Sequence, residues 1–257
     1  MSEAVTATPG NTIQPPTYRG DQEGPLKELG PEQRHILDLQ LSDHARLNEM
    51  ELHSDLRDGF VAGDTSIPSG TLLHGTSYSP EAVRSIAAHG VMSGELFDKP
   101  EDTETNYCAD FWRVEKDTTI GDYCEEITGK EPGVGRLLTS RGERSWIPNP
   151  LTRDERMAVI IDPNIPEIQP LLEADAYRPG TDELFSGIIN HLPAEKGSPK
   201  GERLAAILGG VPKGAIAGIL VSPKLAENTE HIADIVSAFE GKVPVLSITG
   251  ELVAGLS

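Results

Sequence analysis

The chain has 257 residues, and its 22 Lys and Arg against 41 Asp and Glu leave a formal charge of −19. This length suits one large domain or a domain with extensions. The excess of negative charge disfavours nucleic acid as a partner, because proteins bind phosphates with positive charge. No apolar run approaches the roughly 18 residues that span a bilayer, and no charged-then-apolar leader opens the chain, so we expect neither a membrane partner nor a Sec-type signal. The two cysteines are too few for a disulfide framework and favour a reducing compartment. We expect a cytoplasmic protein, or one exported into a host or target cell by a route that needs no signal peptide.

The first 24 residues have almost no periodic apolar pattern and are rich in Pro, Gly and Thr. This composition predicts a disordered tail over residues 1–24. A polar, Ser- and Thr-rich tail is also typical of the uncleaved secretion signal of an exported effector or toxin.

Residues 25–64 are predicted to form an N-terminal helical element. Pro31 suits the first position of a helix, apolar residues recur to about residue 57, and Asp58 with Gly59 is expected to end the stretch. His35, His44 and His53 recur every nine residues. Nine residues turn a helix by about 900°, so successive histidines lie on opposite faces and cannot share a metal ion.

Residues 65–257 are predicted to form the main domain, with several short strands and few helices between them. This pattern predicts an α+β fold rather than a doubly wound parallel sheet. Strands are expected at residues 70–74, 110–114, 157–161, 202–208, 215–221 and 243–248, and helices at 79–90, 117–127 and 224–241.

The chain lacks the motifs of several large enzyme classes. It has no Gly-x-Gly-x-x-Gly after a strand, no phosphate loop, no Gly-x-Ser-x-Gly, no His-Glu-x-x-His and no Cys-x-x-Cys. Dehydrogenases, nucleotide hydrolases, α/β-hydrolases and zinc enzymes are therefore not first choices. We expect no bound metal.

The string His74-Gly75-Thr76 follows a short apolar run and precedes a predicted helix. The imidazole can donate or accept a hydrogen bond, and Thr76 adds a hydroxyl. Because Gly75 has no side chain, a flat ligand can approach its backbone N–H and C=O, which can pair with a carboxamide. The structural alternative is a turn that holds a hydrogen-bonded histidine.

This string resembles the first motif of the ADP-ribosyltransferase superfamily, in the branch that contains poly-ADP-ribose polymerases, rifampin ADP-ribosyltransferases, RNA 2′-phosphotransferases and DNA-modifying toxins. That motif is an apolar strand, His-Gly-Thr or His-Gly-Ser, a helix with an Ile near its end, and a Gly. Ile86, His89 and Gly90 complete it, so about 20 residues match. The resemblance implies a split β-sheet core over residues 65–257 and NAD as a consumed substrate.

A second block in this family is a strand with an aromatic residue, followed by a helix. Phe111, Trp112 and Tyr123 stand at the matching positions, with Tyr107 nearby. An aromatic ring here would stack on nicotinamide, although the family often has Tyr where this chain has Phe111 or Trp112. An aromatic residue that belongs to the core is the alternative.

The third block is a glutamate on a strand before a Pro-containing turn, and Glu202 has that context. Its rivals are Glu195 in the preceding loop, and Glu227 and Glu230 on the last helix, where they are expected to be solvated. Arginine-directed toxins of the family carry Glu or Gln two residues before the catalytic Glu. Lys200 stands there instead, so arginine is disfavoured as the acceptor.

The resemblance implies that His74 hydrogen-bonds the adenine-side ribose, that the Gly75 backbone holds the nicotinamide amide, and that Glu202 binds the 2′-hydroxyl of the nicotinamide ribose. The predicted function is a mono-ADP-ribosyltransferase that modifies a protein. Because of the charge of −19, the acceptor is expected to have a basic surface, with ubiquitin as one example. The alternatives are an RNA 2′-phosphotransferase or nucleic-acid ADP-ribosyltransferase, and a non-catalytic binding module.

Overall fold

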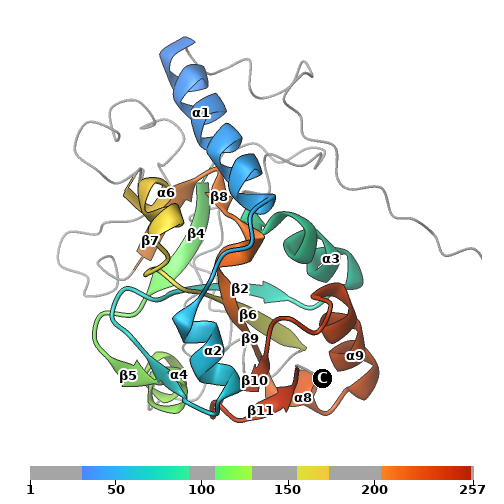
Figure 1. The fold of residues 1–257 in the computed structure, drawn as a ribbon. Coiled ribbons are helices and arrows are strands. Elements are labelled where there is room, and N and C mark those ends of the chain that lie inside the picture. The colour runs from blue at the N-terminus through green and yellow to red at the C-terminus, as the bar shows by residue number, and fades with distance from the viewer. Residues whose placement is uncertain (1–30, 93–107, 129–154, 174–203, 256–257) are drawn as a thin grey trace, which may run out of the picture.

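A seven-stranded sheet organises the protein. The computed structural model describes residues 31–92, 108–128, 155–173 and 204–255, and within them the strand order is β11-β10-β9-β6-β2-β4-β7 (Figure 1). Neighbouring strands are antiparallel except β9 and β10, which are parallel. Helices accompany the sheet, which confirms the predicted α+β class. The strands are β2 (Leu72–Ser77), β4 (Cys108–Arg113), β6 (Arg156–Ile161), β7 (Leu204–Leu208), β9 (Ile216–Val221), β10 (Val245–Ser247) and β11 (Leu252–Ala254).

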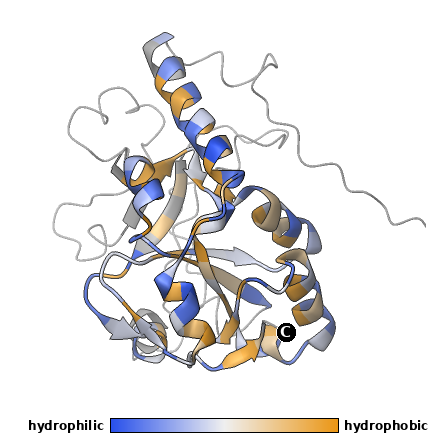
Figure 2. Ribbon diagram, in the orientation of Figure 1, coloured by the Kyte–Doolittle hydropathy of each residue, from blue (hydrophilic) through white to orange (hydrophobic). Residues whose placement is uncertain are grey.

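The two faces of the sheet carry separate hydrophobic cores. Val159 and Ile160 are neighbours on β6 but belong to different cores, because successive side chains of a strand point to opposite faces. One core packs against α3 and α9, and we call this side the α3–α9 face. The other packs against α2 and α4, on the α2–α4 face. Apolar residues concentrate in the central strands of the sheet (Figure 2). The helices are α1 (Pro31–Asn48), α2 (Asp55–Val61), α3 (Pro80–His89), α4 (Ile120–Thr128), η4 (Pro166–Ile168), α6 (Gln169–Glu173), η6 (Lys213–Ala215), α8 (Pro223–Ala226) and α9 (Thr229–Ala238).

A short strand pair joins the end of α3 to the turn after β7. β3 (Val91–Met92) pairs with β8 (Gly210–Val211). The sequence predicts only a turn at the position of β8. A Cβ on Gly90 would lie 2.2 Å from a backbone oxygen of β8, and a Cβ on Gly210 would lie 2.1 Å from a backbone oxygen of β3. Both glycines are therefore required by close backbone approach. A second small sheet pairs β1 (Ser66–Ile67) with β5 (Thr118–Thr119).

The helix after the His-Gly-Thr strand has the boundaries that its sequence predicts. Ser79 caps α3 by accepting a hydrogen bond from the backbone N–H of Ala82, and Pro80 occupies the first turn. Gly90 follows the last turn with φ of +81°, a conformation that glycine adopts without strain.

The predicted C-terminal helix is two helices. α8 begins after Ser222, whose side chain accepts from Leu225 N, and α9 begins after Asn228, whose side chain accepts from His231 N. An Asn side chain bonds nearby backbone donors better at a helix start than in a helix interior. Asn228 therefore interrupts what the apolar pattern alone predicts as one continuous helix.

The N-terminal helical element also differs from its predicted boundaries. α1 ends at Asn48, and α2 begins after Ser54 and continues through Asp58 and Gly59, which the sequence predicted as its end. Ser54 caps α2 and donates a hydrogen bond of 2.7 Å to Asp162 Oδ2. Ser54 is therefore a local start signal for α2, and its bond to Asp162 is a long-range contact that the local sequence does not show.

The sequence also predicts a tail over residues 1–24, which lies outside the described residues. In the described segments, the structure contains no helix that is both long and apolar enough to cross a membrane.

Candidate functional site

The His-Gly-Thr string lies on β2, in the interior of the sheet. β2 pairs with β6 along all six of its residues, from Leu72 opposite Ile161 to Ser77 opposite Arg156. Its ladder with β4 covers only Leu72 and Leu73, and β4 runs at a steep angle to β2 in Figure 1. Among the described residues, the hydrogen-bonded ladder between these two strands therefore ends just before His74.

The backbone of Gly75 faces the side on which this ladder ends. Tyr78 N donates to Glu155 O at 3.0 Å on the β6 side, whereas Val114 N donates to Thr71 O at 2.8 Å on the β4 side. Backbone polar groups of an antiparallel strand alternate in direction, so those of Gly75, which is an even number of residues from Thr71, point toward β4. On this side of β2, no strand of the described segments pairs with Gly75, whereas β6 pairs with it on the other side. A ligand that enters here would meet one N–H and one C=O of Gly75.

His74 is half-buried on the α3–α9 face, next to an aromatic side chain of β4. The ring centroids of His74 and Phe111 are 5.7 Å apart, and the ring planes are tilted by 59°. Phe111 is 1% exposed, so it supports one side of the imidazole as part of the core. Thr76 follows on the same face, and its hydroxyl donates to Ser77 O at 3.3 Å.

The predicted aromatic residues lie on different sides of the sheet. Phe111 belongs to the core of the α3–α9 face, and Tyr123 on α4 belongs to the core of the α2–α4 face, where it is 5% exposed. A ring bound on one face cannot stack on both of them. The backbone of Trp112 pairs with Leu73 on one side and with Leu204 on the other. The prediction that one of these rings stacks on nicotinamide stays a prediction.

The strand that follows Glu202 lies next to the aromatic strand. Glu202 and its rival Glu195 lie outside the described residues, but β7 begins at Leu204, opposite Trp112. The strands of the three predicted motif blocks, β2, β4 and β7, are therefore consecutive in the sheet. The other two rivals, Glu227 and Glu230, are exposed, as their sequence context predicts.

A polar cluster that no sequence pattern predicted connects the C-terminal end of β2 to α9. The hydroxyl of Tyr78 donates to Asp234 Oδ2 at 2.9 Å, and its ring stacks on His231 with 4.1 Å between centroids. His231 Nδ1 lies 3.1 Å from Glu155 Oε2. Burial, followed by the hydrogen bond to Asp234, raises the pKa of Tyr78 to about 12, so the phenol stays protonated. No local signal links Tyr78 to Asp234, because 156 residues separate them.

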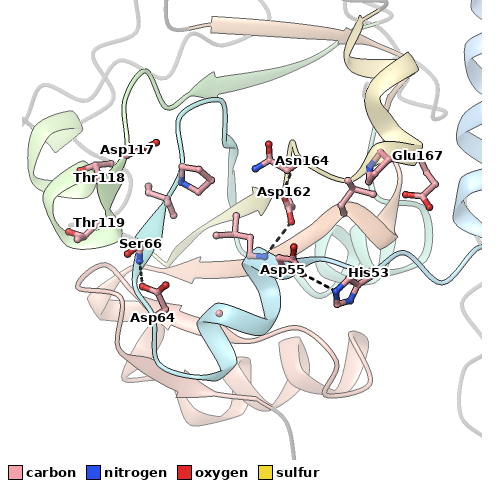
Figure 3. Close-up of a pocket in the computed structure, with 16 residues that line it drawn as sticks. His53, Asp55, Asp64, Ser66, Asp117, Thr118, Thr119, Asp162, Asn164 and Glu167 are labelled. Atoms are coloured by element: carbon pink, nitrogen blue, oxygen red, sulfur yellow. Dashed lines mark hydrogen bonds and ion pairs between the residues drawn. The ribbon is translucent and has the colours of Figure 1, made fainter.

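A second concave site lies at the opposite end of β2, between α2, β1, β5 and the segment after β6 (Figure 3). Its volume is about 1000 Å³. No motif predicted it, because its walls come from four separate chain segments. Among the described residues that line it, the acidic ones are Asp55, Asp64, Asp117, Asp162 and Glu167.

Two further observations concern metal-ligating side chains and the thiol of Cys124. They contain no group of three or more His, Cys, Asp or Glu side chains arranged to hold a metal ion. Cys124 is buried, and burial raises the pKa of its thiol to about 12. It is therefore a protonated core residue rather than a nucleophile at neutral pH.

Comparison with known proteins found no relative: no family model, no curated protein and no solved structure matches this chain. The resemblance to ADP-ribosyltransferases therefore depends on the motif residues themselves. The structure supports this resemblance through the positions of β2, β4 and β7, which are consecutive in the sheet.

Proposed function

We propose that the protein is a mono-ADP-ribosyltransferase that cleaves NAD at its nicotinamide bond and transfers ADP-ribose to a protein. The observation that carries this proposal is the end of the β2–β4 ladder just before His74. This arrangement leaves the Gly75 backbone directed toward the β4 side, where no strand among the described residues pairs with it. The proposal includes the split-sheet core that the resemblance implies.

The order of the motif strands supports the proposed catalytic role of Glu202. Paired strands are about 4.8 Å apart, so the step from Leu73 on β2 across Trp112 on β4 to Leu204 on β7 is about 10 Å. The two residue steps along the chain from Leu204 back to Glu202 add at most about 7 Å. Glu202 is therefore close enough for a carboxylate and the His74 imidazole to contact opposite ends of one extended dinucleotide.

In the proposed reaction, the Gly75 N–H and C=O pair with the nicotinamide carboxamide, and His74 hydrogen-bonds the adenine-side ribose. The bond between ribose C1′ and the nicotinamide nitrogen breaks, and its electron pair leaves with nicotinamide. Positive charge builds on C1′ and the ring oxygen, as in glycoside hydrolysis. The Glu202 carboxylate stabilises that charge more in the transition state than in the ground state. The acceptor nucleophile then bonds to C1′ and releases its proton.

The decisive experiment compares the wild type with Glu202→Gln, using labelled NAD and a cell lysate. We expect the substitution to lower transfer by about 10²–10³-fold, as the loss of one preorganised electrostatic group does in other enzymes. NAD affinity should change little. Glu195→Gln is the matched control and should transfer normally. Normal transfer by Glu202→Gln would refute the assignment, and loss in Glu195→Gln alone would move the carboxylate to that residue.

The same experiment separates the alternative functions. Label on nucleic acid, or removal of a 2′-phosphate from RNA, would indicate a nucleic-acid-modifying enzyme. Absence of nicotinamide release under all conditions would indicate a binding module without catalysis. Label on protein, identified by mass spectrometry, would also reveal the acceptor residue.

A further inference from the structure

The pocket beside α2 has apolar walls and an acidic lining (Figure 3). Its volume of about 1000 Å³ is at the upper end of the range for ligand sites, so it can hold a side chain together with neighbouring parts of a partner. The apolar part of its wall is formed by Leu56, Ile67, Pro68, Ile165 and Pro166.

The pocket carries an unbalanced negative charge. Five carboxylates line it, and none of the described lining residues is Lys or Arg; His53, which also lines it, lies 2.9 Å from Asp55 Oδ1. Two of the carboxylates are held by backbone donors, since Asp64 accepts from Ser66 N and Asp117 accepts from Ser69 N, each at 2.9 Å. Hydrogen bonds from the Ser66 side chain and then from its backbone lower the pKa of Asp64, which is therefore ionised at neutral pH. Neutral donors orient these groups but do not cancel their charge.

Asp162 adds a buried carboxylate without a cationic partner among the described residues. It is 2% exposed, and it accepts from Ser54 Oγ at 2.7 Å, from Asn164 N at 2.9 Å and from Leu56 N at 3.4 Å. All three donors are neutral. Acidic side chains are rarely so deeply buried without a counter-charge, so this wall of the pocket favours a cation.

We propose that this pocket binds a Lys or Arg side chain on an exposed segment of a basic partner protein. The aliphatic stem of such a side chain would lie on the apolar wall, and its charged head would meet the carboxylates through charge-assisted hydrogen bonds. The charge of −19 on the whole chain would attract the same partner over a longer range.

The location of the pocket suggests which partner this is. β4 and β6 are antiparallel to β2, and β7 is antiparallel to β4. The C-terminal ends of β4 and β6 therefore lie at the same edge of the sheet as the N-terminal ends of β2 and β7. The pocket residues Asp117 and Asp162 follow the ends of β4 and β6, and β7 begins two residues after Glu202. We infer that the bound partner is the acceptor protein, a step that rests on the proposed function.

The test measures binding without NAD, so that it is independent of catalysis. The probe is a fluorescein-labelled peptide of alternating lysine and leucine residues, titrated at about 0.15 M salt to limit long-range attraction. The pocket variant is Asp64→Asn with Asp117→Asn, because Asn can still accept the two backbone hydrogen bonds. The matched control is Glu49→Gln with Glu251→Gln, two exposed residues that do not line the pocket.

We expect the pocket variant to bind the peptide about tenfold more weakly than the wild type, and the control to bind it as the wild type does. Equal weakening in both variants would overturn the proposal, because it would show attraction by net charge alone. Absence of peptide binding by the wild type, or full displacement of the peptide by an equal concentration of spermidine, would also overturn it. A wild type that binds the peptide at the pocket but never releases nicotinamide would refute the proposed function and leave the pocket assignment standing.

Discussion

The two ends of β2 present polar groups in different ways. At its C-terminal end, the β4 ladder stops before His74, and the Gly75 backbone faces the side that lacks a paired strand in the described segments. At its N-terminal end, the ladder continues, and the nearby polar groups are side chains that four chain segments bring around one pocket. The first end is suited to a small planar amide, which two backbone groups can bind. The second is suited to a flexible cationic side chain, which needs several carboxylates and an apolar wall.

The largest expected effect tests whether Phe111, which lies beside His74 on β2, is a core residue. Phe111→Ala should lower the free energy of unfolding by about 4 kcal/mol, because a fully buried ring leaves a cavity. Urea denaturation measures this difference. Leu39→Ala, at a residue that is 54% exposed, is the control and should cost less than about 0.5 kcal/mol. A loss below about 1 kcal/mol for Phe111→Ala would mean that the ring is not part of the core and is free to contact a ligand.

The next effect tests the pocket end, where Asp162 joins the N-terminal helices to the sheet. Asp162→Ala leaves Ser54 Oγ and two backbone N–H groups without their acceptor, and should cost about 3 kcal/mol of stability. Asp55→Ala is the control, because the Asp55 side chain is 97% exposed. Thermal unfolding distinguishes the two. Similar small losses in both variants would show that Asp162 does not anchor α2.

A pH effect of intermediate size tests the burial of His44 on α1. Burial lowers the pKa of His44 from 6.5 to about 4. Below pH 6.5 the unfolded chain binds a proton that the folded chain excludes, so stability is lost as the pH falls from 6.5 toward 4. At pH 5, this linkage should lower the free energy of unfolding by about 2 kcal/mol. His44→Gln should remove this part of the difference between pH 7 and pH 5, and an unchanged pH dependence would contradict the burial of a neutral His44.

The smallest expected effect concerns Tyr78, which fastens the C-terminal end of β2 to α9. Tyr78→Phe keeps the ring on His231 but removes the hydrogen bond to Asp234, so it should cost about 1 kcal/mol. Chemical denaturation measures the loss, and a double-mutant cycle with Asp234→Ala should give a coupling energy of similar size. Additive losses in that cycle would show that the two side chains do not interact.

Local signals were sufficient for the elements that have their own start and stop residues. The pattern of Ser79, Pro80 and Gly90 predicted α3 at its observed boundaries. The apolar run before His74 predicted a strand over residues 70–74, whereas β2 runs from Leu72 to Ser77 and contains the whole His-Gly-Thr string. Apolar periodicity alone does not show the start of α9, which Asn228 marks by accepting a hydrogen bond from His231 N. The start of α2 has a local signal in the cap residue Ser54, but the bond from Ser54 to Asp162, 108 residues away in the chain, has none.

The amino-acid sequence alone determined that a strand carries His74 and that a capped helix follows it, because strand and helix signals act over a few neighbouring residues. Tertiary structure decided the rest. The ladder between β2 and β4 ends beside Gly75, Tyr78 meets Asp234, and carboxylates from four segments line one pocket. Each of these depends on how distant segments pack, and the free energy of packing is shared among contacts that no short stretch of sequence contains.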